Sequence, residues 1–163
     1  MLDAPMLDPH ELRNAFGCLP TGVTVVSMLD EAGKPTGVTV GSFTSLSISP
    51  ALCLFSLGKQ QASARLFKEG APFVVNVLST DLEDLAWQFA KPLEDKCAGA
   101  ELTESLVQAP RLKGAIAHFA CHAYTIHDGG DHIIVVGEIL DFDHKEGDAL
   151  IFYRGQMQTS APL

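Results

Sequence analysis

The sequence predicts a mainly β protein, an antiparallel barrel or sandwich with a few short helices. Its 163 residues fit one domain, and the 47% that are hydrophobic are enough to fill a core. About seven strand-like segments alternate with about three helical ones, and tight turns join neighbouring strands more often than helical crossovers do. Such connections favour antiparallel pairing over a doubly wound parallel sheet. Because the strands at both ends of the sheet need partners, a barrel closed by dimerisation is a reasonable architecture.

The N-terminal half opens with a helix. Asp8 is an effective N-cap and Pro9 suits the first helical position, so the helix begins there. Turn residues at 30–35 and a short helix over 62–69, closed by Gly70, separate the strands that follow. Those strands are expected at the apolar, β-rich segments 23–29, 37–43, 52–57 and 73–78.

The C-terminal half begins with a further helix. Thr80 and Glu83 are spaced as in a capping box, which predicts a helix that runs through Phe89. The polar segment 92–110 is expected to loop over the surface. A turn at 128–130 then separates two long strands. The strands expected in this half are 116–126, 132–142 and 149–153.

Charge and composition exclude several classes of function. The formal net charge of −9 argues against a nucleic-acid partner, because a phosphate backbone needs a basic face. No segment approaches the roughly 20 apolar residues that span a bilayer. Residues 1–11 lack the basic and apolar regions of a signal peptide. We therefore expect no membrane partner and a cytoplasmic location.

The four cysteines, Cys18, Cys53, Cys97 and Cys121, contain no C-x-x-C pair. Cys53 and Cys121 lie in apolar runs, where free cysteines behave as small buried hydrophobes. A disulfide framework is not expected in a cytosolic protein of this size.

Several catalytic devices are absent from the sequence. It contains no G-x-S-x-G nucleophile elbow, no H-E-x-x-H, no G-x-x-x-x-G-K-[ST] phosphate loop and no G-x-G-x-x-G that opens a helix. An enzyme with this sequence needs chemistry that does not depend on those devices. Hydride transfer through a flavin is such a chemistry, because the flavin reacts and the protein supplies position and electrostatics.

A cluster of histidines with one cysteine has the residue types of a zinc or iron site. Its members are His118, Cys121, His122, His127 and His132. The spacing does not suit a metal, because His118 and His122 share one face of a strand while Cys121 points to the other. We therefore expect no metal site.

Three polar clusters remain, and each has two interpretations. Hydroxyls gather at 41–47, which suits the edge of a polar heterocycle or an ordinary Ser/Thr turn. Two cations and a serine stand at 58–65, where a helix is expected to begin, as in an anion site or in a capped surface helix. Residues 127–132 combine glycines with His132, which suits the close approach of a ligand or the tip of a hairpin.

In their order and spacing, six segments resemble the flavin reductase family of split β-barrel, FMN-binding proteins. They read LRNAF, LPTGVTVV, SFTSLSISP, FVVNVL, GDHIIVVGE and LIFYRG, and they lie at 12–16, 19–26, 42–50, 73–78, 130–138 and 150–155. The resemblance covers about residues 11–157, so 1–163 is expected to be a single domain of this kind.

The resemblance implies roles for individual residues. Those along the flavin ring and its ribityl chain would be Gly41, Ser42, Phe43 and Thr44, with Ser47 nearby. Those around the flavin phosphate would be Lys59, Gln61, Ser63 and Arg65. The loop 92–96, which ends at Lys96, would cover the flavin. Those at the nicotinamide would be Gly130, Asp131 and His132, with Tyr153 lining the same pocket. His132 would be the catalytic residue, by orienting the nicotinamide.

Three positions depart from the residues that are common in the family. Ala51 replaces a second proline, Gln61 replaces a serine beside the phosphate, and Cys97 replaces a phenylalanine after Lys96. A glutamine amide can still donate a hydrogen bond to a phosphate.

The same resemblance implies an NAD(P)H:flavin oxidoreductase. In such enzymes nicotinamide C4 delivers a hydride to flavin N5, with NADH or NADPH as the donor and FMN or FAD as the flavin. A homodimer would hold the flavin at or near the subunit interface and supply reduced flavin to a partner flavin-dependent monooxygenase. Two alternatives stay open, a flavoprotein electron carrier with tightly bound flavin and a non-enzymatic split barrel that binds another ligand.

Overall fold

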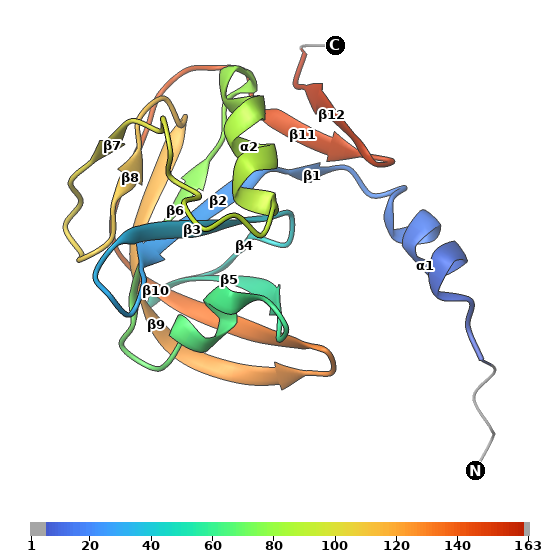
Figure 1. Cartoon of the computed structure of the whole chain (residues 1–163), viewed down its shortest axis with the longest axis horizontal. Helices are drawn as coiled ribbons and strands as arrows, with labels where there is room; N and C mark the ends of the chain where they lie inside the picture. The colour runs from blue at the N-terminus through green and yellow to red at the C-terminus, as the bar shows by residue number, and fades with distance from the viewer. Residues whose placement is uncertain (1–5, 162–163) are drawn as a thin grey trace.

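The computed structural model describes residues 6–161 and consists mainly of antiparallel strands (Figure 1). The strands are β1 (Thr21–Gly22), β2 (Thr24–Leu29), β3 (Pro35–Val40), β4 (Thr44–Ile48), β5 (Ala51–Gly58), β6 (Pro72–Val77), β7 (Leu102–Thr103), β8 (Arg111–Leu112), β9 (Ala117–Gly129), β10 (His132–His144), β11 (Leu150–Tyr153) and β12 (Gln156–Thr159). The helices are α1 (Pro9–Phe16), α2 (Glu83–Ala90) and two 3₁₀ helices, η1 (Ala62–Leu66) and η2 (Thr80–Leu82). Neither α-helix in this range has the length and apolar character that a membrane crossing requires.

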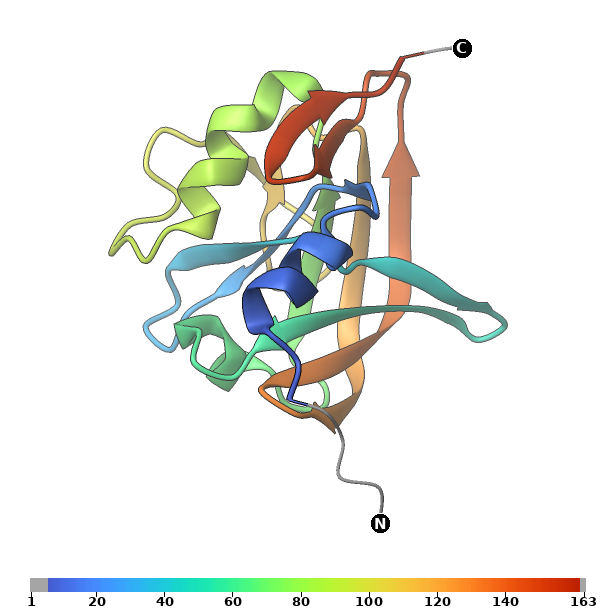
Figure 2. The same cartoon turned by 90° about the vertical axis from the view of Figure 1, so that its right-hand side faces the viewer.

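Seven strands form one curved sheet in the order β3-β2-β6-β9-β10-β5-β4, and all neighbours are antiparallel. The long β9–β10 hairpin lies in its middle, and β10 also pairs with β5. The register of this hairpin is irregular after Val136 and after Ile139, and such bulges bend a sheet. The sheet curls round in Figures 1 and 2, while the β4–β5 hairpin projects from the body (Figure 2). The predicted mainly β, antiparallel fold is confirmed.

Three phenylalanine rings fill the centre of the curled sheet. Phe55, Phe67 and Phe73 pack edge to face, with ring centroids 5.4 to 5.6 Å apart. Gly137 on β10 makes room for them, because a Cβ there would lie 2.5 Å from Cζ of Phe73. Aromatic pairs in this arrangement stabilise a core beyond the area that they bury. The cluster therefore ties β5 and β6 to the segment that follows η1.

A buried asparagine connects the main sheet to β8. Asn76 on β6 is fully buried, and its Nδ2 donates to the Val25 carbonyl and to Oγ of Ser27, both at 2.9 Å. Its Oδ1 accepts a hydrogen bond from the Leu112 backbone N–H at 2.8 Å. Because each polar atom of the amide has a partner, the burial of this polar group costs little.

The first helix and most strands lie where the sequence predicts them. Asp8 caps α1, since its Oδ1 accepts from the backbone N–H groups of His10 at 2.8 Å and Glu11 at 3.3 Å. Strands β2, β5, β6, β9, β10 and β11 match the predicted segments to within a few residues. The thiols of Cys53 and Cys121 are buried as expected; they form a weak hydrogen bond at 3.9 Å and no disulfide.

Two helix predictions are wrong in detail. The expected helix over 62–69 is only the five-residue 3₁₀ helix η1, because Phe67 leaves the helical path and packs against the core. The capping box does not form, since Oγ1 of Thr80 contacts the Asp148 carbonyl at 3.3 Å and Oγ1 of Thr159 at 2.8 Å instead. The helix α2 begins at Glu83, three residues after the predicted cap Thr80, and has no side-chain cap.

The sequence also missed several short strands. The strand expected over 37–43 ends at Val40, and residues 44–48 then form β4. Most of β4 is exposed, because it lies at the edge of the sheet and pairs only with β5. The remaining missed strands, β1, β7, β8 and β12, have two to four residues each. They depend on pairing with distant segments rather than on a local pattern.

Candidate functional site

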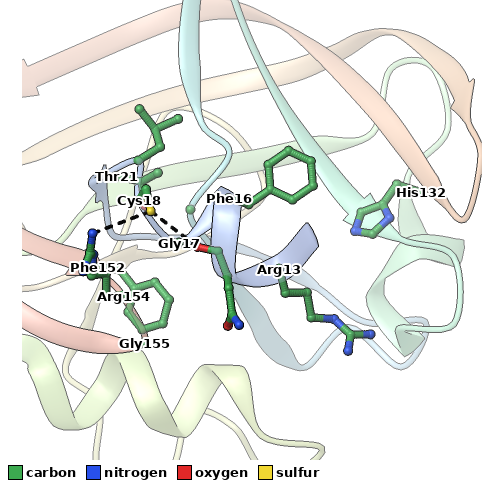
Figure 3. A pocket seen from close by; sticks show the side chains of 12 residues that line it. Arg13, Phe16, Gly17, Cys18, Thr21, His132, Phe152, Arg154 and Gly155 are labelled. Carbon is green, nitrogen blue, oxygen red and sulfur yellow. Dashed lines mark hydrogen bonds between the residues drawn. The ribbon is translucent and has the colours of Figure 1, made fainter. Parts of the chain in front are cut away.

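A large open cavity of about 1050 Å³ lies between α1, the end of β3, the start of β10 and the turn after β11. Its lining residues are Arg13, Asn14, Phe16, Gly17, Cys18, Leu19, Thr21, Gly41, His132, Phe152, Arg154 and Gly155. In the view of Figure 3, Arg13 lies between Arg154 and His132. The cavity therefore joins segments from the two ends of the chain to the tip of the long hairpin.

The helix α1 forms one wall of this cavity without packing into the core. It buries no residue, and Phe16 is 70% exposed. In Figure 1 it stands away from the barrel. Its C-terminal end is fixed instead by the backbone, since the Arg154 N–H donates to the Gly17 carbonyl at 3.0 Å. This wall leaves apolar surface free for a ligand or for another chain.

Gly41 lies where this cavity meets two smaller ones of about 260 and 180 Å³. A Cβ on Gly41 would lie 2.9 Å from Oγ1 of Thr21, so a side chain there would displace this hydroxyl and narrow the junction. The cavity of 260 Å³ is lined by Ser42, Gln61 and His132 as well as Gly41. Four residues that the sequence assigned to flavin and nicotinamide are thus brought together. A narrow glycine-lined junction with hydroxyl, amide and imidazole groups fits a flat polar heterocycle.

The hydroxyl cluster at 41–47 is only partly directed into these cavities. The Ser42 hydroxyl is used locally, because it accepts from the Ser56 N–H at 2.9 Å and donates to the Ser56 carbonyl at 3.1 Å. The Phe43 ring packs on the core, with its centroid 5.5 Å from that of Phe119. Thr44 and Ser47 lie on β4 and line none of the cavities described above.

The turn between β9 and β10 holds His132 in place. Gly130 adopts a φ of 76°, which favours glycine. Nδ1 of His132 lies 2.7 Å from Oδ1 of Asp131, and this hydrogen bond lowers the pKa of the Asp131 carboxyl. The Lys59 N–H donates to the Asp131 carbonyl at 2.9 Å, which fixes the turn against the end of β5. Because Nδ1 is engaged, Nε2 of His132 is the ring nitrogen left for a ligand.

The cations expected at a phosphate already have acidic partners. The Lys59 ammonium pairs with the Asp128 carboxylate, and Nε of Arg65 lies 3.5 Å from Oε1 of Glu31. Ser63 is buried within η1. The helix dipole that the sequence suggested for this site is missing, because η1 is a five-residue 3₁₀ helix rather than an α-helix.

Lys96 and Tyr153 do not line the large cavity. Nζ of Lys96 donates to the Phe89 carbonyl at 3.0 Å, at the C-terminal end of α2, and burial lowers the pKa of this ammonium. The ring of Tyr153 lies beside the Arg154 guanidinium, whose Cζ is 5.4 Å from the centroid of that ring. Its neighbours Phe152 and Arg154 line the cavity instead.

Sequence reasoning missed most of the cavity wall. The ten missed residues are Arg13, Asn14, Phe16, Gly17, Cys18, Leu19, Thr21, Phe152, Arg154 and Gly155. One signal was present, since Leu12, Phe16 and Leu19 form an apolar face on and after α1 that buries nothing. An amphipathic helix with an unburied apolar face indicates a surface for a ligand or a partner.

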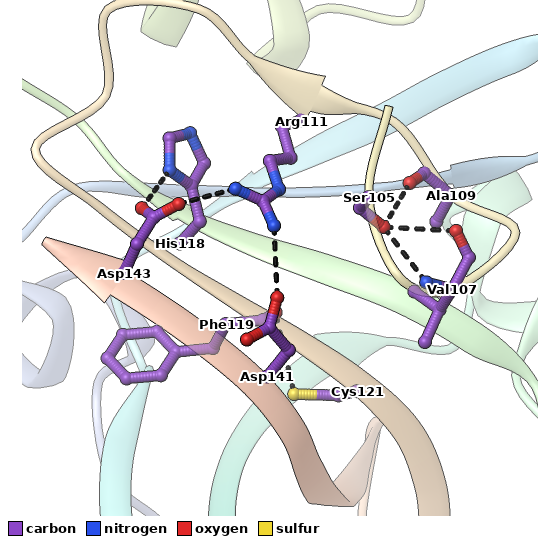
Figure 4. A network of polar contacts seen from close by, with 9 residues as sticks. All are labelled: Ser105, Val107, Ala109, Arg111, His118, Phe119, Cys121, Asp141 and Asp143. Atoms are coloured by element: carbon purple, nitrogen blue, oxygen red, sulfur yellow. Dashed lines mark hydrogen bonds and ion pairs between the residues drawn. The ribbon is translucent and has the colours of Figure 1, made fainter. Parts of the chain in front are cut away.

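The residues considered as metal ligands do not come together. Within residues 6–161 no group of three or more histidine, cysteine or acidic side chains is arranged to hold a metal ion. His118 belongs to a polar network (Figure 4), with Nδ1 2.7 Å from Oδ1 of Asp143 and Nε2 2.9 Å from the Leu112 carbonyl.

Comparisons with known proteins place these observations in context. The model of the "Flavin reductase like domain" family matches residues 16–161. The reductase component of the flavin-dependent trigonelline monooxygenase of Acinetobacter baylyi is 38% identical over 93% of this chain and 49% of its own. The FMN reductase (NADH) SmoA of Agrobacterium fabrum is 39% identical over 90% of this chain and 83% of its own. The chain spans about half the length of the first two curated relatives it matches.

A solved structure gives the same result for the fold. The Streptomyces globisporus NADH:FAD oxidoreductase SgcE6, in complex with NAD and FAD fragments, superposes with a TM-score of 0.87 at 34% identity. The match covers 98% of each chain. The split-barrel architecture expected from the sequence is thereby confirmed.

Proposed function

Because the chain belongs to the flavin reductase like domain family, we propose that it is an NAD(P)H:flavin oxidoreductase that transfers a hydride from nicotinamide C4 to flavin N5. One observation carries the proposal. Gly41 and His132 line both the cavity of about 1050 Å³ and the adjoining cavity of about 260 Å³. Two planar rings can therefore meet at one junction, which hydride transfer requires.

The residues of this junction position and shield rather than react. Gly41 leaves space for a flat ring, and His132 orients the nicotinamide. With Nδ1–H donated to Asp131, the neutral imidazole presents Nε2 as an acceptor, which suits the NH₂ group of a carboxamide. When bound, flavin and nicotinamide supply the hydride chemistry themselves. His132 is a catalytic residue in this sense, without giving up a proton.

We further propose that Lys59, Gln61, Ser63 and Arg65 bind the flavin phosphate, with the residues around Ser42 along the ribityl chain. The ion pairs of Lys59 and Arg65 do not oppose this, because exposed pairs contribute only about 0–1 kcal/mol and a phosphate can replace the carboxylate. The double variant Lys59→Ala/Arg65→Ala is expected to weaken flavin binding by roughly 1–3 kcal/mol. An unchanged dissociation constant for FMN would remove both residues from the phosphate site.

The names of the relatives support the choice of cofactor and partner. SmoA is named for FMN and NADH, and SgcE6 for FAD and NADH, so we propose NADH as the donor and FMN or FAD as the acceptor. The trigonelline relative is a reductase component of a monooxygenase. We propose that this chain likewise supplies reduced flavin to a separate flavin-dependent monooxygenase.

We also propose that the protein is a homodimer. The edge strand β4 leaves one side of its backbone unpaired and exposes two large apolar residues, Leu46 at 51% and Ile48 at 91%. The β4–β5 hairpin projects from the body (Figure 2), and α1, which buries no residue, stands away from it (Figure 1). Projecting apolar elements on a small protein are typical of a surface that a partner covers.

A cytoplasmic location and a single domain over 1–163 complete the proposal. The four cysteines are all free thiols, which is the state that a reducing compartment maintains. The family match spans residues 16–161, which supports one domain.

The test is oxidation of NADH, and separately of NADPH, by the purified protein at 340 nm with added FMN or FAD. Rapid turnover that requires flavin is the expected result, and the four combinations give both cofactor preferences. No turnover with either nucleotide, although flavin stays bound, would favour an electron carrier. A colourless protein that binds neither flavin would favour a non-enzymatic barrel.

A further inference from the structure

The arginines of this acidic protein are used in two different ways. The chain has four, against a formal net charge of −9. Arg65 and Arg111 each pair with a carboxylate. Arg13 and Arg154 pair with no carboxylate among residues 6–161, and both line the large cavity. Unpaired cations that gather in one cavity of a negatively charged protein indicate a site for an anion.

The surroundings of Arg154 hold it in a conformation that few residues adopt. Its φ is 48°, the only positive value at a non-glycine residue in the described part of the chain. The backbone is held there by the bond from its N–H to the Gly17 carbonyl. Nη2 makes a weak contact of 3.8 Å with Sγ of Cys18, so most guanidinium N–H groups remain free. Such strained positions persist where the surrounding structure fixes them, and they cluster at ligand sites.

We propose that Arg13 and Arg154 bind the diphosphate of a dinucleotide, NAD(P)H or FAD, within the large cavity. A guanidinium offers paired N–H donors that match phosphate oxygens. The cavity volume of about 1050 Å³ stands at the upper end of the roughly 300–1,000 Å³ typical of ligand pockets, which suits a ligand larger than a mononucleotide. His132 lines the same cavity, so a dinucleotide anchored at its phosphates extends toward the proposed hydride-transfer junction. The inference rests on the proposed function and adds two binding residues to it.

Three titrations distinguish the sources of the diphosphate. NAD⁺ is titrated into protein saturated with FMN, where no reaction occurs because both are oxidised. FAD and FMN are each titrated into flavin-free protein. The variants are Arg13→Gln, on an exposed helix, and Arg154→Asn, because asparagine tolerates the left-handed backbone at this position. Lys34→Gln, which removes the same charge outside the cavity, is the matched control.

Each cavity variant is expected to raise the dissociation constant for NAD⁺, for FAD or for both by about tenfold, the loss of one charge-assisted contact. The constant for FMN stays within about twofold of the wild-type value, as do all constants of Lys34→Gln. The dinucleotide that responds is the one that the arginines bind. An equal loss of affinity for FMN would overturn the inference, because the arginines would then belong to the flavin phosphate. Unchanged dissociation constants for all three ligands would overturn it as well.

Cys18 provides a second readout that needs no enzyme activity. Cys18 is the exposed cysteine among the described residues, whereas Cys53 and Cys121 are buried. Cys97 is less reactive, because burial and the nearby Asp95 raise its pKa to about 11. We expect the responding dinucleotide to slow alkylation of Cys18 by iodoacetamide in the wild type but not in the two arginine variants. Cys18→Ser identifies the labelled site. Equal protection in wild type and variants would overturn the inference.

The inference and the proposed function fail differently. A protein that binds NAD⁺ or FAD through the arginines without oxidising NADH or NADPH would keep the inference and lose the function. A protein that turns over with unchanged constants in both variants would keep the function and lose the inference. A wild type that binds none of the three ligands would overturn both.

Discussion

Two polar regions of the molecule treat their charges in opposite ways. One is the β8 clamp, which consists of Asn76, Arg111, Leu112, His118, Asp141 and Asp143. Figure 4 shows its four charged or ionisable members, Arg111, His118, Asp141 and Asp143. The other is the large cavity with Arg13, Arg154 and His132 (Figure 3). In the clamp every charged group pairs with an opposite charge among the described residues, whereas the cavity arginines pair with no carboxylate there, and Arg154 meets only the Tyr153 ring and Sγ of Cys18.

The clamp is a closed network that attaches β8 to the main sheet. Arg111, whose side chain is 21% exposed, reaches Oδ2 of Asp141 at 3.1 Å and also the Asp143 carboxylate. Asn76 and His118 bind the backbone N–H and carbonyl of Leu112, respectively. Polar groups satisfied in this way contribute to stability, and the one buried polar side-chain atom of the clamp without a hydrogen-bond partner among the described residues is Nε of Arg111.

The cavity shows the reverse arrangement. Its helical wall α1 buries nothing, and its arginines meet no carboxylate among the described residues. Such groups add little to folding but remain available to bind. The comparison teaches that an arginine held between carboxylates, such as Arg111, serves the fold, whereas unpaired arginines that line a cavity are available to a ligand. Variants in the two regions should therefore affect different measurements.

The largest effect is expected from Asn76→Ala in the clamp. The substitution leaves the Leu112 N–H without its acceptor and removes two donated bonds in a fully buried position. We expect the free energy of unfolding to fall by about 3 kcal/mol, measured by urea denaturation. Asn14→Ala in the cavity wall is the matched control and should change it by less than about 0.5 kcal/mol, because Asn14 is exposed on α1. Equal losses in the two variants would contradict the division between the regions.

His132→Ala should produce the next largest effect, on the reaction rather than on stability. His132 is partly exposed and bonds only to its neighbour Asp131, so the unfolding free energy should stay nearly constant. Loss of orientation should slow flavin reduction about 30-fold, or about 2 kcal/mol, measured by stopped-flow absorbance. The dissociation constant of flavin should change much less. Equal losses in rate and flavin binding, or none in either, would make His132 a residue that only shapes the turn.

Much of the fold could be predicted from the sequence because it follows from local patterns. The Asp8–Pro9 start of α1 and the long apolar runs of β9 and β10 are determined by residues close in sequence. The errors arise where distant contacts decide. Phe67 ends η1 early because it packs on Phe55 and Phe73, which no local pattern reveals.

The candidate site was predicted only in part, because some of its residues come from distant segments of the chain. The glycines and the histidine of the 127–132 turn are visible in the sequence, whereas Gly41 was assigned to the site through the family resemblance. Gly41 and His132 line one cavity in the structure. The wall formed by Arg13 and Arg154 is not visible, because α1 and the β11–β12 turn are 141 positions apart (154 minus 13) and meet only in the folded chain. Lys96 shows the opposite case, a predicted site residue that the structure uses to bind the end of α2.

The smallest predicted effect is a pH dependence of the unfolding free energy that comes from Asp143 in the clamp. In the clamp, the hydrogen bond from His118 and the nearby Arg111 lower the pKa of the Asp143 carboxyl. A carboxyl whose pKa is lower in the folded state stabilises the protein fully above its unfolded pKa of about 4, and this contribution is lost as the pH falls through the lower, folded value. Because the Asp143 side chain is 49% exposed, the contribution should be only about 0.5–1 kcal/mol.

Asp143→Asn is therefore expected to be less stable than the wild type at pH 5 and to approach it as the pH falls toward 2, measured by urea denaturation at each pH. Asp148→Asn is the control, since Asp148 is exposed and its side chain has no ion-pair partner within residues 6–161. A difference between Asp143→Asn and the wild type that stays constant from pH 5 to pH 2 would mean that the carboxylate charge contributes nothing. Of the charged pairs in the clamp, only that of Arg111 with Asp141 would then remain to support the contrast with the cavity, beside the neutral hydrogen bonds to Leu112.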